Sequence, residues 1–387
     1  MRRLVVPALL LWTALPAAAD LPSFLTTADY SLYARVREEW ISNSGQEDRN
    51  RLRYMIAGGA VLHPDSNVDV GIRLASGGTT FEASSAISQN VTYDDAFRDD
   101  PLFIDQAWIA YRPPIVESWG LSLVGGKVAS PYLASRISWD GDISPEGGYV
   151  KIAPRVLAPH RLMLIGGAYV LEEQDQGVPT PQGAFTPGQD AYLLFSQLRG
   201  GIDDVGPFDL DGWVSHLHYV RPTIAVRSAN AAAAFGNNTN AGNRFVSEFG
   251  IVSGGIKAAF ELGHRPAWIM GEYSHNDAAR VVPSTGRRED DAWVVEAQWG
   301  KAKKKGTWSV SALYASVEAD ALLAAFIESD WGAGLGSTNF EGWRGNFTVA
   351  LTDHLRLALN YLSVTEEEKY RADPDQNLFQ ADVIVEF

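Results

Sequence analysis

Residues 355–364 read LRLALNYLSV, and their side chains alternate between two kinds along the chain. Apolar side chains stand at 355, 357, 359 and 361, and Arg356, Ala358 and Asn360 fall between them. Successive side chains of a β-strand point to opposite faces, so one face here is apolar and the other is polar or small. The same period recurs at 68–75, 343–351 and 379–387. Each run is about ten residues, the length of a tilted strand across a bilayer, whereas soluble β-sandwiches, the alternative, use strands of about five or six.

The connections between the predicted strands alternate in length. Turns such as 63–66 and 352–354 are short, whereas loops such as 77–101 and 318–339 are long and polar. This asymmetry is typical of outer-membrane barrels, and it predicts an all-β transmembrane antiparallel barrel of about 16 strands. Because lipid offers no partner to an open sheet edge, the first and last strands must pair. The predicted strands are 31–42, 49–62, 67–76, 102–112, 119–128, 147–154, 161–171, 190–199, 209–221, 244–262, 267–275, 290–299, 307–317, 340–351, 355–364 and 378–387.

The N-terminus has the features of a secretory signal. A basic start at residues 1–3 precedes an apolar stretch at 4–15, and Pro16 and three alanines follow. The apolar stretch is too short to span a hydrocarbon core of about 30 Å, so we predict a cleaved signal peptide at 1–19. The remainder, 20–387, is predicted to be one barrel domain in the outer membrane of a Gram-negative bacterium.

Composition excludes several other classes of protein. The 387 residues carry a net charge of −15 with a pI near 4.9, which argues against nucleic-acid binding. The chain has no cysteine, so thiol chemistry and zinc ribbons are excluded. It contains no nucleophile elbow, P-loop or dinucleotide fingerprint, and we therefore expect neither an enzyme nor a cofactor. His216 and His218 share one strand face without a third metal ligand nearby, which favours lumen lining over a metal site.

Residues 137–147 read ISWDGDISPEG and carry the most specific motif of the chain. They resemble the W-D-x-D-x-x-P-E-G segment of the bacterial "putative porin" family. The flanking segments DQAWIAY at 105–111 and VGGK at 124–127 resemble the neighbouring strands of that family, so the specific match covers 102–152. The resemblance implies a β-barrel that forms a water-filled channel for diffusion.

The motif also has a physical interpretation of its own. Asp140 and Asp142 flank a glycine, so both carboxylates can point to one side of a tight bend, and Pro145 prevents continuation of a strand. We expect loop 129–146 to fold into the pore as a constriction that carries Trp139, Asp140, Asp142 and Glu146. Two alternatives remain open: an external acidic loop, or a Ca²⁺ site built from the same carboxylates.

Basic side chains share one face of each of the first strands. An arginine on the lipid face costs about 2–4 kcal/mol at the midplane, so these side chains should face the lumen, opposite the loop carboxylates. Such opposed charges orient dipolar solutes, and the arginines favour small anionic ones. The alternative is purely structural, with arginines paired to acids inside a polar lumen. The predicted pore-lining residues are Arg35, Arg37, Arg49, Arg51, Arg53, Arg73 and Lys127.

The last predicted strand ends on an aromatic residue, Phe387. A C-terminal aromatic resembles the signature of outer-membrane proteins that the barrel-assembly machinery recognises. The other expected partners are outer-membrane lipids, lipopolysaccharide and small polar or anionic solutes, and the analogy of fold allows a homotrimer. The sequence thus predicts a porin for passive diffusion, and the alternative function is a non-conducting scaffold or adhesin barrel.

Overall fold

The computed structural model describes residues 27–45, 47–77, 88–93, 99–154, 161–173, 190–222, 236–240, 244–331, 338–367 and 375–387. The predicted signal peptide at 1–19 lies outside these residues. The division of the chain at residue 20 therefore stays a prediction.

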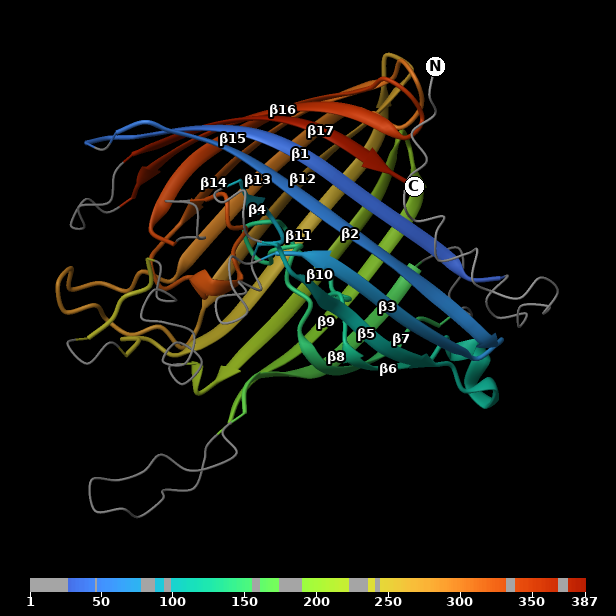
Figure 1. Cartoon of the computed structure of the whole chain (residues 1–387). Helices are drawn as coiled ribbons and strands as arrows, with labels where there is room; N and C mark the ends of the chain where they lie inside the picture. Colours follow the sequence, from blue (N-terminus) through green and yellow to red (C-terminus); the bar gives the residue numbers. More distant parts are fainter. Residues whose placement is uncertain are drawn as a thin grey trace, which may run out of the picture.

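Among the described residues, sixteen long strands form one antiparallel sheet that closes on itself (Figure 1). Closure occurs where β1 pairs with both β2 and β17. The strands are β1 (Asp29–Asn43), β2 (Arg49–Asp65), β3 (Val68–Ser76), β5 (Leu102–Tyr111), β6 (Ser122–Lys127), β7 (Glu146–Ile152), β8 (Arg161–Glu172), β9 (Ala191–Val205), β10 (Phe208–Val220), β11 (Phe249–Leu262), β12 (Arg265–Asn276), β13 (Asp291–Gly300), β14 (Trp308–Val317), β15 (Phe340–Ala350), β16 (Leu355–Glu366) and β17 (Gln376–Glu386). The predicted fold class is confirmed.

Short elements complete the described structure. The two-residue strand β4 (Val91–Thr92) lies in the predicted loop 77–101 and extends the edge of β2 beyond the end of β3. Two 3₁₀ turns are present, η2 (Pro114–Trp119) and η5 (Ala324–Phe326). Because η2 occupies the connection after β5, strand β6 begins at Ser122 and not at the predicted residue 119. Within the described ranges, no helix is long and apolar enough to cross a membrane.

The outer face of the barrel is apolar. Val36 on β1, Ile109 on β5 and Leu198 on β9 are about half exposed, at 46, 59 and 51%. An apolar face this large that surrounds the whole molecule is expected to contact lipid. Aromatic pairs lie near both ends of the strands, as in membrane-interface belts; they include Trp40–Phe379, Trp343–Tyr361 and Trp299–Trp308.

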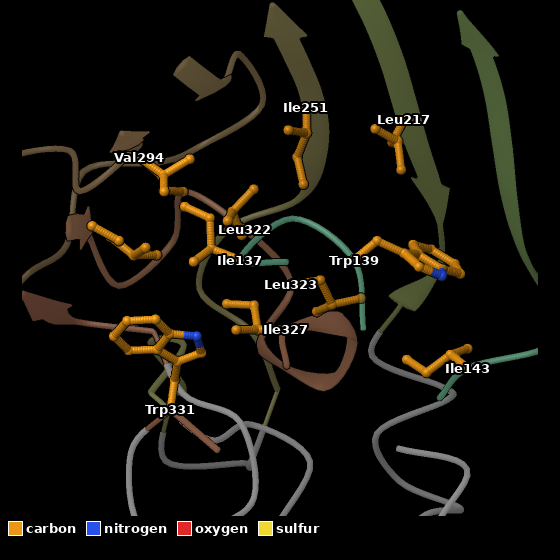
Figure 2. Packing of buried hydrophobic residues seen from close by; sticks show 14 of the residues in the cluster. Ile137, Trp139, Ile143, Leu217, Ile251, Val294, Leu322, Leu323, Ile327 and Trp331 are labelled. Carbon is orange, nitrogen blue, oxygen red and sulfur yellow. The ribbon is translucent and has the colours of Figure 1, made fainter. Parts of the chain in front are cut away.

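Two connections fill part of the interior instead of extending away from the barrel. They are the segment 128–145 between β6 and β7 and the segment 318–331 after β14, and we call them the first and second inner loops. Their apolar side chains pack with the inner faces of β8 to β11 and β13 to β17 in one buried cluster (Figure 2). Trp139 of the first loop contacts Phe326 of the second, with ring centroids 4.9 Å apart. Burial of each large apolar side chain is worth about 1.5–3 kcal/mol, so this half of the lumen is a packed core.

Candidate functional site: the charged lumen

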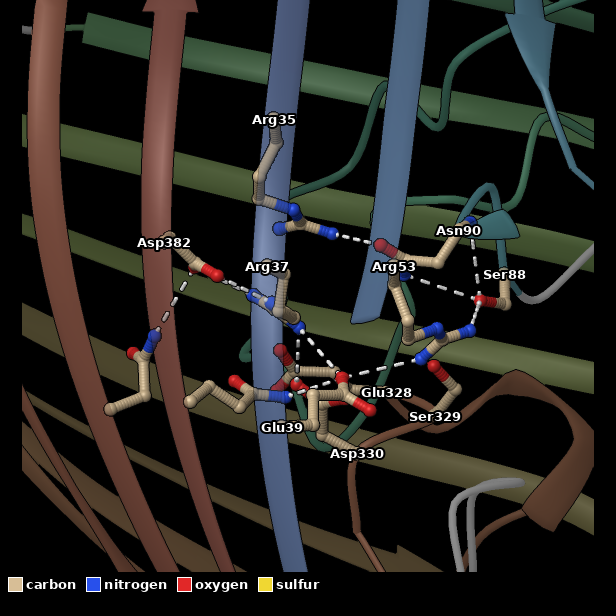
Figure 3. Close-up of polar contacts among 12 residues, drawn as sticks. Arg35, Arg37, Glu39, Arg53, Ser88, Asn90, Glu328, Ser329, Asp330 and Asp382 are labelled. Carbon is tan, nitrogen blue, oxygen red and sulfur yellow. Dashed lines mark hydrogen bonds and ion pairs between the residues drawn. The ribbon is translucent and has the colours of Figure 1, made fainter. Parts of the chain in front are cut away.

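Arg37 is the centre of an ion-pair network on the inner wall formed by β17, β1 and β2 (Figure 3). The register places Arg37 opposite Asp382 of β17, and its Nε and Nη2 donate to the two carboxylate oxygens at 2.6 and 2.8 Å. Its Nη1 lies 3.6 Å from Glu39 and 3.7 Å from Asp330 of the second inner loop. The side chain is only 4% exposed, so this arginine is bound mainly by protein groups.

Glu39 is shared by the arginines of the neighbouring strand. Arg51 and Arg53 of β2 both pair with the Glu39 carboxylate, and Arg53 Nη1 lies 3.3 Å from it. Arg53 Nη2 also donates to Ser88 Oγ at 3.3 Å. Arg49 continues the same face at the end of β2, where its side chain is exposed.

Arg73 of β3 is similarly paired. Its guanidinium contacts the carboxylate of Asp105 on β5. Gln89 links this pair to the first inner loop, because its side-chain amide donates to Asp105 Oδ1 at 2.9 Å and its backbone N–H donates to Asp142 Oδ2 at 3.1 Å. The charge of Arg73 is therefore largely compensated within the wall.

Arg35 differs from the other inward-facing arginines of β1 to β3 in the central part of the wall. Its Nη2 donates to the neutral Asn90 at 2.5 Å and lies 3.9 Å from the sulfur of Met55. Within the part of the chain that the structure describes, no ion pair of Arg35 with a carboxylate closer than 4.0 Å is found. A cavity of about 310 Å³ opens beside it and is lined by Tyr33, Arg35, Met55, Arg73 and Asp142 among others.

The first inner loop is fixed to the wall that lies opposite the arginines. The backbone of Leu133 exchanges two hydrogen bonds with the side chain of Gln197 on β9. Ser135 Oγ and Ser138 Oγ donate to the Glu272 carboxylate on β12 at 2.6 and 2.5 Å. The indole of Trp213 on β10 donates to the same carboxylate at 2.9 Å. Glu272 is 4% exposed, so a buried charge receives several hydrogen bonds from neutral donors.

Asp140 connects the two inner loops. One carboxylate oxygen accepts the N–H of Asp142 at 2.8 Å, and the other accepts the N–H of Ser329 at 3.0 Å. Its own N–H donates to the carbonyl of Phe326 at 2.7 Å. Burial, together with the nearby Asp142 charge, raises the pKa of Asp140 to about 8. Asp140 therefore holds its proton to a higher pH than an exposed aspartate does.

Asp142 and Trp139 occupy different environments. Asp142 lines the cavity beside Arg35. Burial raises the pKa of its carboxyl, although the Gln89 N–H and the Arg35 charge both act to lower it. Trp139 is buried in the apolar cluster, edge-on to Tyr132 with ring centroids 5.2 Å apart. Trp139 thus holds the loop in place and does not line the open space.

The inner-loop acids that form ion pairs with arginines of the barrel wall come from the second inner loop. Glu328 lies 2.7 Å from Arg344 of β15 and 3.3 Å from Arg136 of the first loop, and Asp330 lies 3.7 Å from Arg37 and 3.9 Å from Arg344. Burial opposes the charge of Asp330, but its neighbouring arginines, led by Arg37 and Arg344, lower its pKa to about 2. Sequence reasoning missed these residues. Two features of the sequence could have indicated them. Glu328 and Asp330 lie close together within the loop 318–339, and the polar face of 343–351 carries Arg344.

Two of the residues predicted to belong to the pore face outward. The register pairs Lys127 with Glu146, and both share the face of Leu123 and Val150, which is the apolar outer face. Lys127 Nζ lies 3.4 Å from Glu146 at the end of the strands. The assignment of Lys127 to the pore wall and of Glu146 to the constriction is therefore corrected.

The prediction for the two histidines is also corrected. His216 and His218 are exposed, whereas Trp213, Leu217 and Tyr219 of the same strand are buried on the inner side. The histidines therefore share the outer face of β10, and they do not line the lumen.

Comparison with known proteins places this fold and its motif in a family. The sequence matches the family described as "putative porin" over residues 20–204 and 261–387. The chain therefore belongs to this family, and the resemblance noted at 137–147 is confirmed. No curated protein matches the chain.

Solved structures of bacterial porins share the fold. OprB of Pseudomonas putida is similar with a TM-score of 0.55 and 11% identity, over 93% of this chain and 94% of that chain. OmpF of Salmonella typhi, in complex with daunomycin, gives a TM-score of 0.49 and 10% identity over 93% and 97%. A mutant porin of Rhodopseudomonas blastica gives 0.46 and 9% over 93% and 100%. At these identities the likeness concerns the fold alone. The argument for a shared fold rests on OprB, whose TM-score is 0.55.

Proposed function

We propose that this protein is an outer-membrane porin whose lumen admits small polar solutes by passive diffusion, with no enzymatic activity. Family membership and a barrel wide enough for an aqueous channel support the proposal. The observation that carries it is the charge arrangement of the lumen. Arginines of β1 and β15 face the acids of the second inner loop on one side, while the other side is filled by apolar packing.

The two inner loops are proposed to narrow the channel together. Glu328, Asp330 and Asp142 form the negative side of the constriction. In the central part of the opposite wall, Arg35 is the cation that lacks a close carboxylate partner among the described residues. Opposed charges orient dipolar solutes as they pass. Because Arg37, Arg51, Arg53 and Arg73 are paired with acids, we propose that Arg35 sets a mild preference for anionic solutes.

Planar-bilayer recording tests the channel function directly. The purified barrel should produce stepwise conductance in salt solution. The alternative is a non-conducting scaffold or adhesin, and it predicts insertion into the bilayer without conductance steps. Folded protein that inserts but never conducts would therefore refute the porin proposal.

Replacing Arg35 by Gln should shift the reversal potential in a salt gradient toward cation preference. A unit charge about 8 Å from a permeating ion contributes about 0.5 kcal/mol even at the dielectric constant of water, so the anion-to-cation permeability ratio should fall about two- to fivefold. Arg49→Gln is the matched control, because it removes the same charge from the exposed end of β2 and should cause a smaller shift. Equal shifts in the two variants would rule out a special role for Arg35.

Phe387 is proposed to promote assembly by the barrel-assembly machinery. Its backbone closes the barrel by donating to the Leu32 carbonyl at 3.0 Å, and its ring is 63% exposed on the outer face and stacks on His354. Phe387→Ala keeps the backbone bonds and removes the ring, so we expect less folded barrel in membranes at low expression. Phe387→Trp keeps an aromatic ring and should remain near wild type. Wild-type amounts of the alanine variant, measured by gel shift of unheated samples, would argue against this role.

Export through the signal peptide 1–19, contact with lipopolysaccharide and a homotrimeric state are further parts of the proposal. They follow from the N-terminal sequence and from the analogy of fold. N-terminal sequencing of the purified protein and its mass in mild detergent test the first and the last.

A further inference from the structure

The lysines of this acidic chain are concentrated in one turn. The sequence holds eight lysines, and four of them lie within five residues, at Lys301, Lys303, Lys304 and Lys305. All four are exposed in the connection between β13 and β14. Lys127–Glu146 is the lysine ion pair found in the described part of the chain, and it lies elsewhere. We call residues 301–305 the lysine turn.

The backbone of the lysine turn is firmly held. Thr307 Oγ1 accepts the N–H groups of Lys303 and Lys304, each at 3.0 Å, and donates to the Lys304 carbonyl at 2.6 Å. The N–H of Lys305 donates to the Asp353 carboxylate at 2.8 Å. Gly306 adopts φ of 80°, in the left-handed region that glycine tolerates, and donates to the Ala350 carbonyl at 2.8 Å. The turn therefore presents its ammonium groups from a fixed position.

Aromatic residues place this turn at the level of lipid headgroups. Trp299 and Trp308 flank it on the outer face, with ring centroids 5.0 Å apart. The indole of Trp299 donates to the Leu262 carbonyl at 3.0 Å, and the Arg265 guanidinium lies 4.5 Å from the Trp308 ring. Tryptophan is enriched where the hydrocarbon core meets the headgroups. The lysines follow directly beyond that boundary.

The lysine turn lies at the end of the barrel that carries the short turns and the C-terminus (Figure 1). In outer-membrane barrels this is the periplasmic end. Positive charge is not shared evenly around this rim. The ends of β9 and β10 beside their turn carry the exposed acids Asp203, Asp204 and Asp209. Any anionic ligand of the rim is thus attracted to the side of β11 to β16.

We propose that the lysine turn and Arg265 bind the phosphate groups of anionic phospholipids in the periplasmic leaflet. This inference rests on the proposed membrane location. Lysine clusters next to a membrane-spanning segment attract anionic headgroups, and the tryptophan pair puts these ammonium groups at headgroup depth. Contact with a cell-wall polymer would not require that depth, so we favour the lipid.

Native mass spectrometry of the detergent-solubilised full chain tests the proposal. Phosphatidylglycerol and phosphatidylcholine of equal chain length are supplied at equal concentration. Bound phosphatidylglycerol should exceed bound phosphatidylcholine by at least about fivefold. This is the change in binding expected from one lysine, which contributes about 1 kcal/mol near an anionic surface. The variant K301Q/K303Q/K304Q/K305Q should lose most of this preference, and Arg265 accounts for what remains. The matched control R244Q/R280Q/R287Q/R288Q removes four exposed charges at the long-loop end and should keep the preference.

Three outcomes would overturn the lipid site: no preference in the wild type, an unchanged preference in the lysine variant, or equal loss in the arginine control. Co-sedimentation with peptidoglycan that depends on the lysines, without any lipid preference, would assign the turn to a polymer instead. Gel shift of unheated samples verifies that each variant is folded. Conductance should remain unchanged in the lysine variant because the turn lies outside the lumen, so failure of the lipid site is distinguishable from failure of the porin function.

Discussion

Replacing Arg37 by Gln should destabilise the folded barrel by about 3–5 kcal/mol, the range for removing one partner of a buried ion pair. Arg37 is 4% exposed and forms a bidentate contact with Asp382, and it also lies near Glu39 and Asp330. Without the guanidinium, three carboxylates would lie close together without their shared cation. The midpoint of heat-induced unfolding in detergent, followed by gel shift, should fall markedly compared with wild type.

A second variant distinguishes charge compensation from side-chain packing. Arg37→Gln combined with Asp382→Asn removes one charge of each sign and leaves two amides that can hydrogen-bond, so part of the lost stability should return. Arg49→Gln, at the exposed end of β2, should leave the midpoint near wild type. If Arg37→Gln unfolds at the wild-type temperature, the ion-pair network does not hold β17, β1 and β2 together, and its arginines would be free to serve permeation.

This network shows why the pore wall could be predicted only in part. The alternation of residues 31–42 and 49–62 placed Arg35, Arg37 and Arg53 on one face, and the register of β1 with β2 agrees with that placement. Their partners could not be deduced, because Asp382 and Asp330 are distant in sequence and reach Arg37 only through barrel closure and an infolded loop. The structural interpretation therefore applies to Arg37 and Arg53, and the permeation role is proposed for Arg35 alone.

The predictions that failed have two physical causes. Strand faces were assigned from the rule that apolar side chains contact lipid, but the inner loops create a second apolar environment inside the barrel. On β10 the buried Trp213 and Leu217 therefore face inward, and His216 faces outward. Near Lys127 the strands are rich in glycine at 125–126 and 147–148. The alternation of apolar and polar side chains therefore does not indicate which face of these strands contacts lipid. The barrel itself was predictable because strand length and loop parity do not depend on such details.

Replacing Glu272 by Ala should loosen the first inner loop and make the channel wider and noisier. Glu272 accepts hydrogen bonds from Ser135, Ser138 and Trp213, and a hydrogen bond to a charged group is worth about 1.5–3 kcal/mol. Because 1.4 kcal/mol is about a factor of ten in an equilibrium constant, the loss of even one such bond shifts the ratio of docked to released loop about tenfold. Single-channel recording should show a higher mean conductance and more frequent transitions between levels.

The apolar cluster decides how far this release can go. Trp139 and Ile137 remain buried against the second inner loop and the wall, so we expect excursions of the loop and not its permanent displacement. Ser138→Ala removes one of the hydrogen bonds to Glu272 and should produce the same change in weaker form. A displaced loop also moves Asp142 away from Arg35, so the effect of Arg35→Gln on the reversal potential should change in the Glu272→Ala background. If conductance and noise in Glu272→Ala equal those of wild type, the apolar packing alone fixes the loop, and Glu272 has no positioning role.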